Sequence, residues 1–371
     1  MKISIEKNNI FKSLSHVQSI VEKKNTIPIL SNILLEAKSS SLILTATDMD
    51  ISITEKISCT VIDEGAVTVP AHTLYDIIRK IPDENEIEFI ANDGKKFSIR
   101  SGNSKFSLSC LPKEDFPIID IDKLSNEFLI ESKVFLKLLD KTKFAISNEE
   151  TRYFLNGIYL HKKNINDKDS LSLVATDGHR LAKIDQDFPK GLIDIPGVII
   201  PKKTINELCK LLSDSNDEVT INLDPNKIIF YIGSTVLISK LIDGNFPEYE
   251  RVIPKNNDNI VTLDKNMFSE AVDRVSTITS ERSRAIKLRV LKNLINMTST
   301  DLENGSASED IVSEYQGEEI EIGFNSKYIL EMINHLEDEK ILLKFSDSMS
   351  PVIASESSSN NTVYVLMPMR V

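Results

Sequence analysis

The chain has 371 residues, 41% hydrophobic and 27% charged, so it is long enough for two or three domains with cores of their own. It contains no apolar run close to the ~20 residues that span a membrane, and its first residues alternate like a strand rather than like a signal peptide. The net charge of −12 argues against a protein that wraps nucleic acid by charge alone. We therefore expect a multidomain cytoplasmic protein.

Six amphipathic helices are predicted from apolar residues spaced three and four apart. Pro70 and Pro201 stand just ahead of the second and fourth helices, where a missing N–H costs little. Short alternating strands, such as 86–90 and 97–100, fill the intervals. The predicted helices span residues 9–24, 71–80, 132–146, 202–212, 264–278 and 325–336.

The same pattern is repeated three times along the chain. A Thr-Asp pair follows a strand-like run at Asp48, Asp177 and Asp301, which are 129 and 124 residues apart. In each copy one predicted helix precedes this pair and another follows it. The repeat predicts three domains, 1–124, 125–252 and 253–371, each with two helices against an antiparallel sheet in an α+β fold.

The three aspartates have two interpretations. They could be catalytic carboxylates, but three equivalent copies favour a turn-forming Asp after each strand. His179 could be a general base, yet no Ser or Cys partner lies near it in sequence. Ser101-Gly102-Asn103-Ser104 is typical of a turn rather than of a phosphate-binding loop. We predict no catalytic residue.

The cysteines and histidines do not form a metal-ligand pattern. Cys59, Cys110 and Cys209 are far apart, are odd in number and contain no Cys-x-x-Cys pair. We expect each to be a small buried residue in a reducing compartment. The five histidines also lack metal-ligand spacing. Neither a metal nor a cofactor is predicted.

Charge is divided unevenly between the predicted helices and the rest of the chain. The helices hold 15 basic and 8 acidic residues, a net +7, whereas the remainder holds 29 and 48, a net −19. If the helices share one side, that side attracts phosphate. Lys133, Lys137 and Lys141 form one stripe that could touch a phosphate backbone without reading bases. The alternative is that lysine simply suits a solvated helix.

Several motifs, in one order, resemble the beta subunits of bacterial DNA polymerase III, the β sliding clamps, over essentially the whole chain. The motifs are Pro28-Ile29-Leu30-Ser31-Asn32, Phe106-Ser107-Leu108, Arg152-Tyr153-Phe154-Leu155-Asn156-Gly157, Thr176-Asp177-Gly178-His179-Arg180-Leu181 and Met367-Pro368-Met369-Arg370-Val371. The resemblance implies a head-to-tail homodimer whose six domains close a ring around duplex DNA. It also implies a processivity factor that tethers polymerases and the clamp loader through short tails bearing Gln and Leu or Phe.

The resemblance also implies three sets of site residues. The peptide-binding set is Leu155, Thr176, Gly178, His179, Arg180, Leu181, Pro247, Arg251, Val252, Val365, Met367, Pro368, Met369 and Arg370. Together with the lysine stripe, the DNA-binding candidates are Lys24, His72, Arg79, Lys133, Lys137, Lys141, Tyr153, Lys202 and Lys203. The dimer-interface candidates are Lys105, Phe106, Leu108 and Ile278. Lysine lacks the bidentate fork of arginine, so contacts at Lys24 and Lys202 are expected to be weak.

Two other functions stay open at the level of sequence. An enzyme that uses the repeated aspartates or His179 would lose turnover when Asp177 is replaced. A peptide-binding adaptor of the same ancestry would be a monomer that is not retained on circular DNA.

Overall fold

The structure is a computed structural model that describes residues 1–23, 26–83, 85–92, 94–119, 124–165, 168–189, 192, 194–359 and 361–370. Within these residues all six predicted helices are confirmed, with ends that differ by up to four residues. Pro70 caps the second helix and Pro201 directly precedes the fourth, as predicted. The helices are α1 Lys7–Ile20, α2 Ala71–Lys80, α3 Ser132–Lys143, α4 Lys202–Ser213, α5 Lys265–Ser276 and α6 Ser326–Asn334.

The chain divides into two compact units, which do not coincide with the three repeats. The first unit comprises Met1–Leu136, Pro189–Pro196 and Lys203–Leu241, and the second comprises Lys137–Phe188, Gly197–Lys202 and Ile242–Val371. The middle repeat is therefore shared between the two units.

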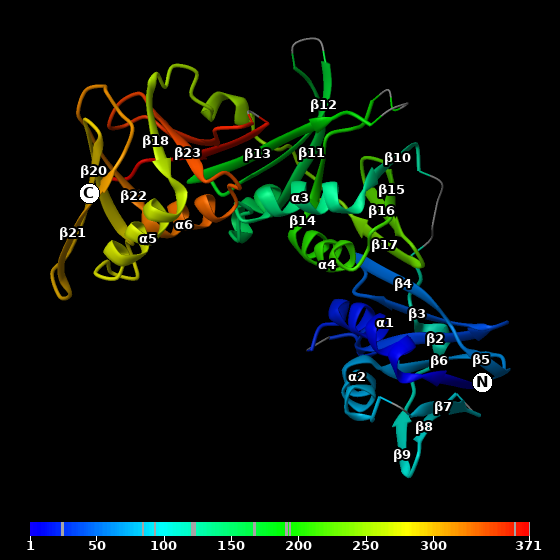
Figure 1. Ribbon diagram of the computed structural model, residues 1–371. Helices are drawn as coiled ribbons and strands as arrows, with labels where there is room; N and C mark the ends of the chain where they lie inside the picture. The colour runs from blue at the N-terminus through cyan, green and yellow to red at the C-terminus, as the bar shows by residue number, and fades with distance from the viewer. Residues whose placement is uncertain are drawn as a thin grey trace. The chain divides into compact units, whose positions relative to one another are not determined.

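The first unit contains two antiparallel sheets. In the five-stranded sheet the order is β5 (Thr60–Asp63), β1 (Lys2–Glu6), β7 (Glu86–Ala91), β8 (Lys96–Ser101) and β9 (Ser104–Ser109). In the eight-stranded sheet it is β10 (Asn126–Glu131), β15 (Glu218–Leu223), β16 (Lys227–Ile232), β17 (Thr235–Lys240), β4 (Ile51–Ser58), β3 (Ser41–Thr47), β2 (Asn32–Lys38) and β6 (Gly65–Pro70). Helices α1 and α2 lie side by side, and α1 packs on β3 and β4 (Figure 1).

The second unit has the same plan. Its eight-stranded sheet runs β14 (Val198–Pro201), β11 (Gly157–Ile165), β12 (Lys168–Thr176), β13 (Arg180–Asp187), β25 (Thr362–Leu366), β24 (Val352–Glu356), β23 (Lys340–Phe345) and β18 (Asn259–Asp264). Its four-stranded sheet runs β21 (Gly305–Val312), β20 (Leu294–Asp301), β19 (Ala285–Leu291) and β22 (Ile320–Asn325). Helix α5 contacts α6, β20 and β21.

Each eight-stranded sheet joins two repeats through one strand pair. Strand β17 of the middle repeat pairs with β4 of the first, from Thr235–Glu55 to Ser239–Ile51. Strand β13 of the middle repeat pairs with β25 of the third. Main-chain hydrogen bonds thus cross both repeat boundaries, which explains why compact units and repeats differ.

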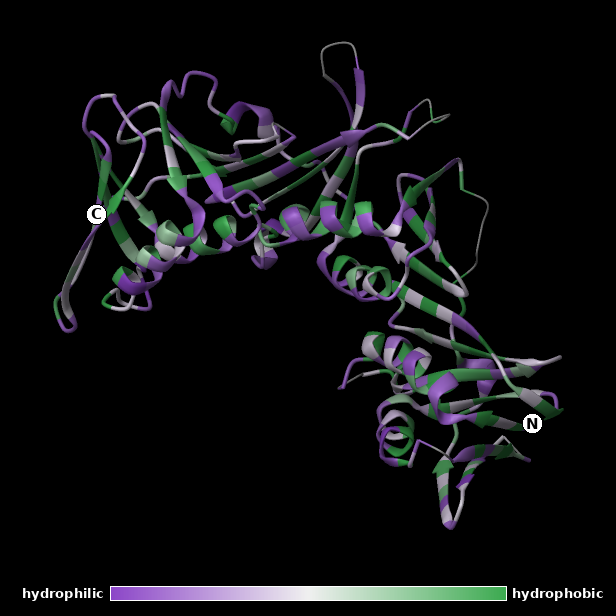
Figure 2. Cartoon of the chain, viewed as in Figure 1, coloured by the Kyte–Doolittle hydropathy of each residue, from purple (hydrophilic) through white to green (hydrophobic). Residues whose placement is uncertain are grey.

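Alternating burial builds the cores. Figure 2 shows hydrophobic and hydrophilic residues interleaved along the helices and strands, as the sequence periodicity predicts. In the first unit the rings of Phe89 and Phe97 meet at 4.9 Å between centroids. Cys209 is buried as predicted, but the same prediction was wrong for Cys59 and Cys110, which are half-buried; none of the three is in a disulfide. No described helix is long and apolar enough to cross a membrane.

The three repeated aspartates form three equivalent turns. Asp48 Oδ1 accepts the N–H groups of Asp50 and Ile51 at 2.9 and 2.8 Å. Asp177 does the same for the second and third residues after it, at 2.9 and 3.0 Å, and Asp301 at 3.0 Å for both. The turn prediction is confirmed, and each of these oxygens is occupied by its own backbone.

A charged cluster fastens α1 to the end of α4 inside the first unit. His16 Nδ1 lies 3.0 Å from Glu55 Oε2, and its Nε2 lies 3.1 Å from Asp214 Oδ2. Lys12 also reaches Asp214, at 3.2 Å, and Ser13 donates to Glu55 at 2.5 Å. Because carboxylates only accept, both ring nitrogens donate when His16 is an imidazolium. Burial lowers the pKa of His16, but Glu55 and Asp214 outweigh it and raise the pKa above 6.5.

We therefore expect the first unit to lose stability as the pH rises. A folded-state pKa above the unfolded value gives stabilisation that is complete below about pH 6.5 and is lost as the pH passes the raised value. The free energy of unfolding, measured with urea between about pH 6 and pH 9, should fall more steeply in the native chain than in His16→Gln. Parallel curves would contradict a charged His16 in the folded state.

Candidate functional site

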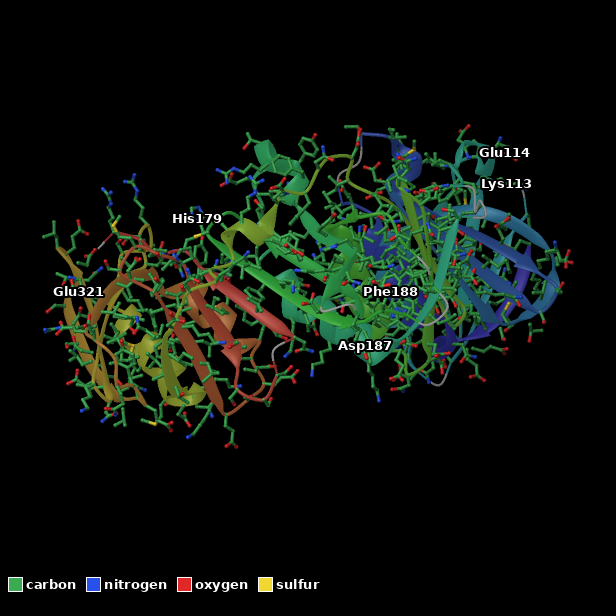
Figure 3. All side chains as sticks on the ribbon, turned by 90° about the horizontal axis from the view of Figure 1, so that it is seen from above. Lys113, Glu114, His179, Asp187, Phe188 and Glu321 are labelled. Atoms are coloured by element: carbon green, nitrogen blue, oxygen red, sulfur yellow. The ribbon has the colours of Figure 1, made fainter. Side chains whose placement is uncertain are left out.

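The turn from Thr176 to Arg180 joins β12 to β13 and has a fixed backbone. Thr176 Oγ1 donates to the carbonyl of Arg180 at 2.7 Å and accepts the N–H of Gly178 at 3.1 Å. Gly178 has a φ of 87°, and a Cβ there would lie 2.9 Å from Nη1 of Arg152. The positive φ therefore favours glycine, whereas the end of the flexible Arg152 side chain could move aside for a Cβ. Gly178 and His179 are exposed at the tip, and His179 stands at the opposite end of β13 from Asp187 (Figure 3).

Arg180 lies beneath this turn, only 8% exposed. Its guanidinium donates to Asp177 Oδ2 at 3.1 Å, to the carbonyl of Phe144 at 2.6 Å and to Glu331. These three acceptors come from the turn, from the residue after α3 and from α6. The resemblance places Arg180 in the peptide-binding set. Its guanidinium is buried and engaged within the fold, so it holds the turn in position.

Tyr328 on α6 is a candidate site residue that sequence reasoning missed. Its ring centroid lies 4.5 Å from the guanidinium carbon of Arg180 and 6.1 Å from the ring centroid of His179. The apolar spacing of the predicted helix 325–336 counts Tyr328 among the residues of its buried face, but it is half-buried beside the turn. Only its aromatic character could have signalled a surface role.

Three neighbouring strands of the second unit's eight-stranded sheet bring the candidates Thr176, Leu181 and Val365 together. Leu181 on β13 pairs with Thr176 on one side and with Val365 on the other. Leu181 and Val365 are buried in one apolar cluster with Val174 and Tyr249. Leu155, 4% exposed, ends the short 3-10 helix η3 (Glu150–Leu155) that leads into β11. We call Leu155, Leu181 and Val365 the apolar row; these side chains are only 0–4% exposed and support the turn from within the fold.

The segment between the middle and third repeats contributes three further peptide-binding candidates. The short 3-10 helix η4 (Tyr249–Val252) follows Pro247, whose carbonyl accepts the N–H of Tyr249 at 2.7 Å. Tyr249 anchors this segment in the apolar cluster. Pro247 and Arg251 are exposed, and Val252 is 37% exposed although it is apolar. These three candidates are available to a ligand.

The last described residues continue from β25 across to the four-stranded sheet. Met367 donates its N–H to the carbonyl of His179 at 2.9 Å, and Met369 donates to Gly323 at 2.8 Å. Met367, Pro368 and Met369 are half-buried, and Arg370 is exposed. A pocket of about 430 Å³ lies between this tail and β22, where Glu321 is labelled in Figure 3. The tail therefore contacts the turn at one end and the four-stranded sheet at the other.

The basic candidates differ widely in availability. Lys24 lies outside the described residues. Arg79, Lys133 and Tyr153 are exposed, and Arg79 pairs with Asp76 at 2.9 Å. The remaining described candidates all have partners in the fold. His72 Nε2 contacts the carbonyl of Val21 at 2.9 Å, and Lys202 contacts Asn148 at 2.5 Å. Lys203 contacts Asp48 at 2.5 Å and Glu22 at 3.3 Å, and Lys137 pairs with Glu337 at 2.6 Å.

The predicted lysine stripe was wrong at its third residue. Lys141 is 4% exposed, and its Nζ lies 2.6 Å from Glu356 Oε1, which is 5% exposed. A buried ammonium in an ion pair cannot contact a phosphate backbone. Spacing on a helix fixes the face but does not show that another strand covers it.

The comparisons with known proteins agree with this architecture. Family models for the DNA polymerase III beta subunit match in three parts: the N-terminal domain at residues 1–120, the central domain at 129–248 and the C-terminal domain at 250–370. The chain belongs to the DNA polymerase III beta subunit family. A beta sliding clamp of Caulobacter vibrioides is 44% identical over 372 residues, and that of Escherichia coli K12 is 34% identical over 372, each covering 100% of both chains.

Solved beta subunits have the same fold. The DnaN sliding clamp of Bartonella birtlesii, solved with griselimycin bound, has a TM-score of 0.97 at 44% identity and covers 100% of both chains. The DNA polymerase III subunit beta of Pseudomonas aeruginosa has a TM-score of 0.94 at 34% identity, again over 100% of both chains. The expected family and the α+β fold of three clamp domains are confirmed.

In the described part of the chain, no group of three or more His, Cys, Asp or Glu residues could hold a metal ion. The ring of His179 stacks on Tyr328, and the backbone occupies one oxygen of each repeated aspartate.

Among the described strands that end a sheet, β9 and β21 carry mostly exposed side chains. Strand β9, with Lys105, Phe106 and Leu108, ends the five-stranded sheet, and β21 ends the four-stranded sheet. Phe106 is 38% exposed, whereas Leu108 and Ile278 are half-buried. An unpaired edge presents free main-chain donors and acceptors and is a template for another chain.

Breaking the buried pair at Lys141 should destabilise the second unit strongly. Lys141→Met leaves the carboxylate of Glu356 buried without its cation, which costs about 3 kcal/mol. The matched control is Lys137→Met, which breaks the exposed pair with Glu337 and should cost less than about 1 kcal/mol. Urea unfolding of both variants measures the difference. Equal losses would show that burial does not decide the strength of these pairs.

Proposed function

We propose that this chain is a processivity clamp that encircles duplex DNA without sequence specificity and tethers polymerases to it. The observation that carries the proposal is the match to beta sliding clamps over the full length of both chains, at 44% identity with a TM-score of 0.97. The unit of function is a ring made of two copies, each with three domains bounded near residues 124 and 252. Adjacent family models that end and begin close to these positions support the boundaries.

The ring closes through two equivalent interfaces. At each of them β9 of one copy pairs with β21 of the other. The two edges lie in different parts of the chain, so a head-to-tail pairing uses both on each copy. Lys105 on β9 and Asp310 on β21 have opposite charge, whereas the neighbouring Glu309 already pairs with Arg274 at 2.6 Å. Phe106 and Leu108 supply the apolar part. Charge and edge geometry therefore favour this pairing over one between like edges.

Replacing Phe106 with Asp should convert the dimer to a monomer. The change puts a carboxylate where an apolar ring would be covered, next to an acidic strand of the partner. Sedimentation at micromolar concentration measures the mass, and the exposed Lys292→Asp serves as the control for a new acid elsewhere. A dimer that survives in Phe106→Asp would place the contact on another surface.

DNA contact in this proposal is weak and mobile. The basic excess lies on the helices, with Arg79, Lys133 and Tyr153 exposed, whereas most of the other described candidates are engaged in the fold. A closed ring holds DNA by topology, so few contacts with phosphate suffice. The acidic strands and loops would repel DNA from the outer surfaces. The test is whether the loaded protein stays on a closed DNA circle and leaves when the circle is cut.

The surface formed by the turn, the apolar row, Pro247–Val252 and the tail is proposed to bind partner peptides. Its half-buried methionines adapt to different side chains, and its partners order short tails bearing Gln and Leu or Phe. These partners are polymerase catalytic subunits and the clamp loader. In this proposal the chain has no catalytic centre of its own and no cofactor, and it acts in the bacterial cytoplasm, a reducing compartment that suits three cysteines outside any disulfide.

A peptide-binding adaptor that does not close around DNA is the second candidate. The exposed surface near the turn would suit it equally well. The free edges of β9 and β21 favour the clamp, because an adaptor needs neither.

A further inference from the structure

A pocket of about 790 Å³ lies beside the proposed peptide surface and has an aromatic floor. The rings of Phe246 and Tyr159 stack with 4.9 Å between centroids and an angle of 6°. The rings of Tyr159 and His161 stack at 4.6 Å, and Tyr249 closes the row. Pro254 lines the side. We call this space the aromatic pocket.

The floor of the aromatic pocket is uncharged. His161 Nδ1 lies 2.8 Å from the carbonyl of Lys162, which only accepts, so Nδ1 carries a proton. Its Nε2, 3.0 Å from the hydroxyl of Tyr249, then accepts that O–H. Burial lowers the pKa of His161 and raises the pKa of Tyr249, so both stay neutral near pH 7. A neutral floor of stacked rings favours an aromatic or proline side chain.

Among the described residues, one cation on the rim of the pocket has no ion-pair partner. Lys163 pairs with Glu250 at 2.5 Å, and Arg251 pairs with Glu248. Lys255 is exposed, lines the pocket and has no ion-pair partner among the described residues. The free ammonium favours a carboxylate on the occupant.

The aromatic pocket continues the proposed peptide surface. Pro247 and Arg251 belong to both, since they line the pocket and are among the peptide candidates. Tyr159 and Phe246 pack against the same buried cluster that holds Leu181 and Val365. A chain bound against Pro247 and Arg251 is therefore already at the edge of the pocket.

We propose that the aromatic pocket binds the segment that flanks a partner's docking peptide, through one aromatic or proline side chain followed or preceded by an acidic residue. The inference rests on the proposed function, because it assumes that the neighbouring surface holds the peptide itself. It adds a second subsite that ranks partners by their flanks. Two partners with the same short motif would then differ in affinity.

Fluorescence anisotropy with three labelled peptides tests this on the full-length protein. The first carries only a five-residue motif with Gln, Leu and Phe. The second adds Gly-Ser-Phe-Asp at its carboxyl end, and the third adds Asp-Phe-Ser-Gly at its amino end. Each is also made with Phe and Asp replaced by Ser. We expect one extension to tighten binding about tenfold, as burial of one ring implies, and its Ser version to give no gain.

Variants of the pocket separate it from the peptide surface. Phe246→Ala should abolish the gain, and Lys255→Glu should remove about threefold of it, with the affinity for the short peptide unchanged by Lys255→Glu. Lys292→Glu, an exposed lysine elsewhere in the second unit, is the matched control and should keep the gain. The thermal midpoint shows whether Phe246→Ala is folded, and the exposed Lys255→Glu does not depend on that result.

The outcomes distinguish the two proposals. If the short peptide binds but neither extension gains more than twofold, or if the gain survives Lys255→Glu undiminished, the aromatic pocket is not a subsite and the proposed function stands. If the short peptide itself does not bind, the peptide surface and the pocket fall together.

Discussion

Deleting residues 367–371 is expected to weaken binding of a Gln/Leu/Phe-containing peptide by at least about 100-fold. The deletion removes the half-buried Met367, Pro368 and Met369, and with them the main-chain bonds to His179 and Gly323. It should spare the fold, because β25 ends at Leu366 and its pairing with β13 stays intact. Anisotropy with a labelled peptide measures the affinity.

The matched control is a shorter deletion. A chain that ends at Met369 keeps both main-chain bonds and both methionines, so it should retain most of the affinity. Sedimentation should give the dimer mass for both truncated chains, since neither touches β9 or β21. Unchanged affinity after the longer deletion would move the peptide site away from this tail.

The second large effect is retention on circular DNA. After a clamp loader and ATP have acted on a nicked plasmid, the protein should co-elute with the plasmid in gel filtration at about 0.2 M salt, where weak phosphate contacts alone fail. Cutting the plasmid once should release nearly all of it within minutes, because a ring slides off a free end. The physical reason is topological, so the result should not depend on base sequence.

The control for retention is Phe106→Asp, which is expected to be monomeric and should not stay on either DNA form. Equal retention on circular and linear plasmid would show that charge, and not closure, holds the protein. Retention of the native chain on neither form would favour the adaptor.

Much of the fold follows from local patterns. Both ends of α2 were predicted correctly from Pro70 and the spacing of the apolar residues. These signals depend only on residues close together in the sequence. The aspartate turns were equally predictable, since Asp48 and Asp177 bond only to the backbone two and three residues onward. Resemblance then supplied the long-range arrangement that local patterns lack.

What could not be predicted depends on partners distant in sequence. Lys141 looks like any solvated helix lysine until Glu356, 215 residues away, buries it. Arg180 likewise follows an exposed turn, yet its guanidinium is held by Glu331, 151 residues on. The middle repeat is divided between the two units because its strands pair with strands of the first and third repeats. Sequence periodicity shows which face of a strand is buried but not which strand lies next to it.

The strand pairs that cross the repeat boundaries have a consequence for how assembly can be observed. Amide protons in β4 and β17 are locked in a shared ladder inside one chain, so their exchange with deuterium should be slow at any protein concentration. Outward amides of β9 and β21 have no such ladder in the single chain and should exchange quickly when the protein is dilute. Protection of these amides from exchange should increase with protein concentration, so the two edges report subunit association without an attached probe.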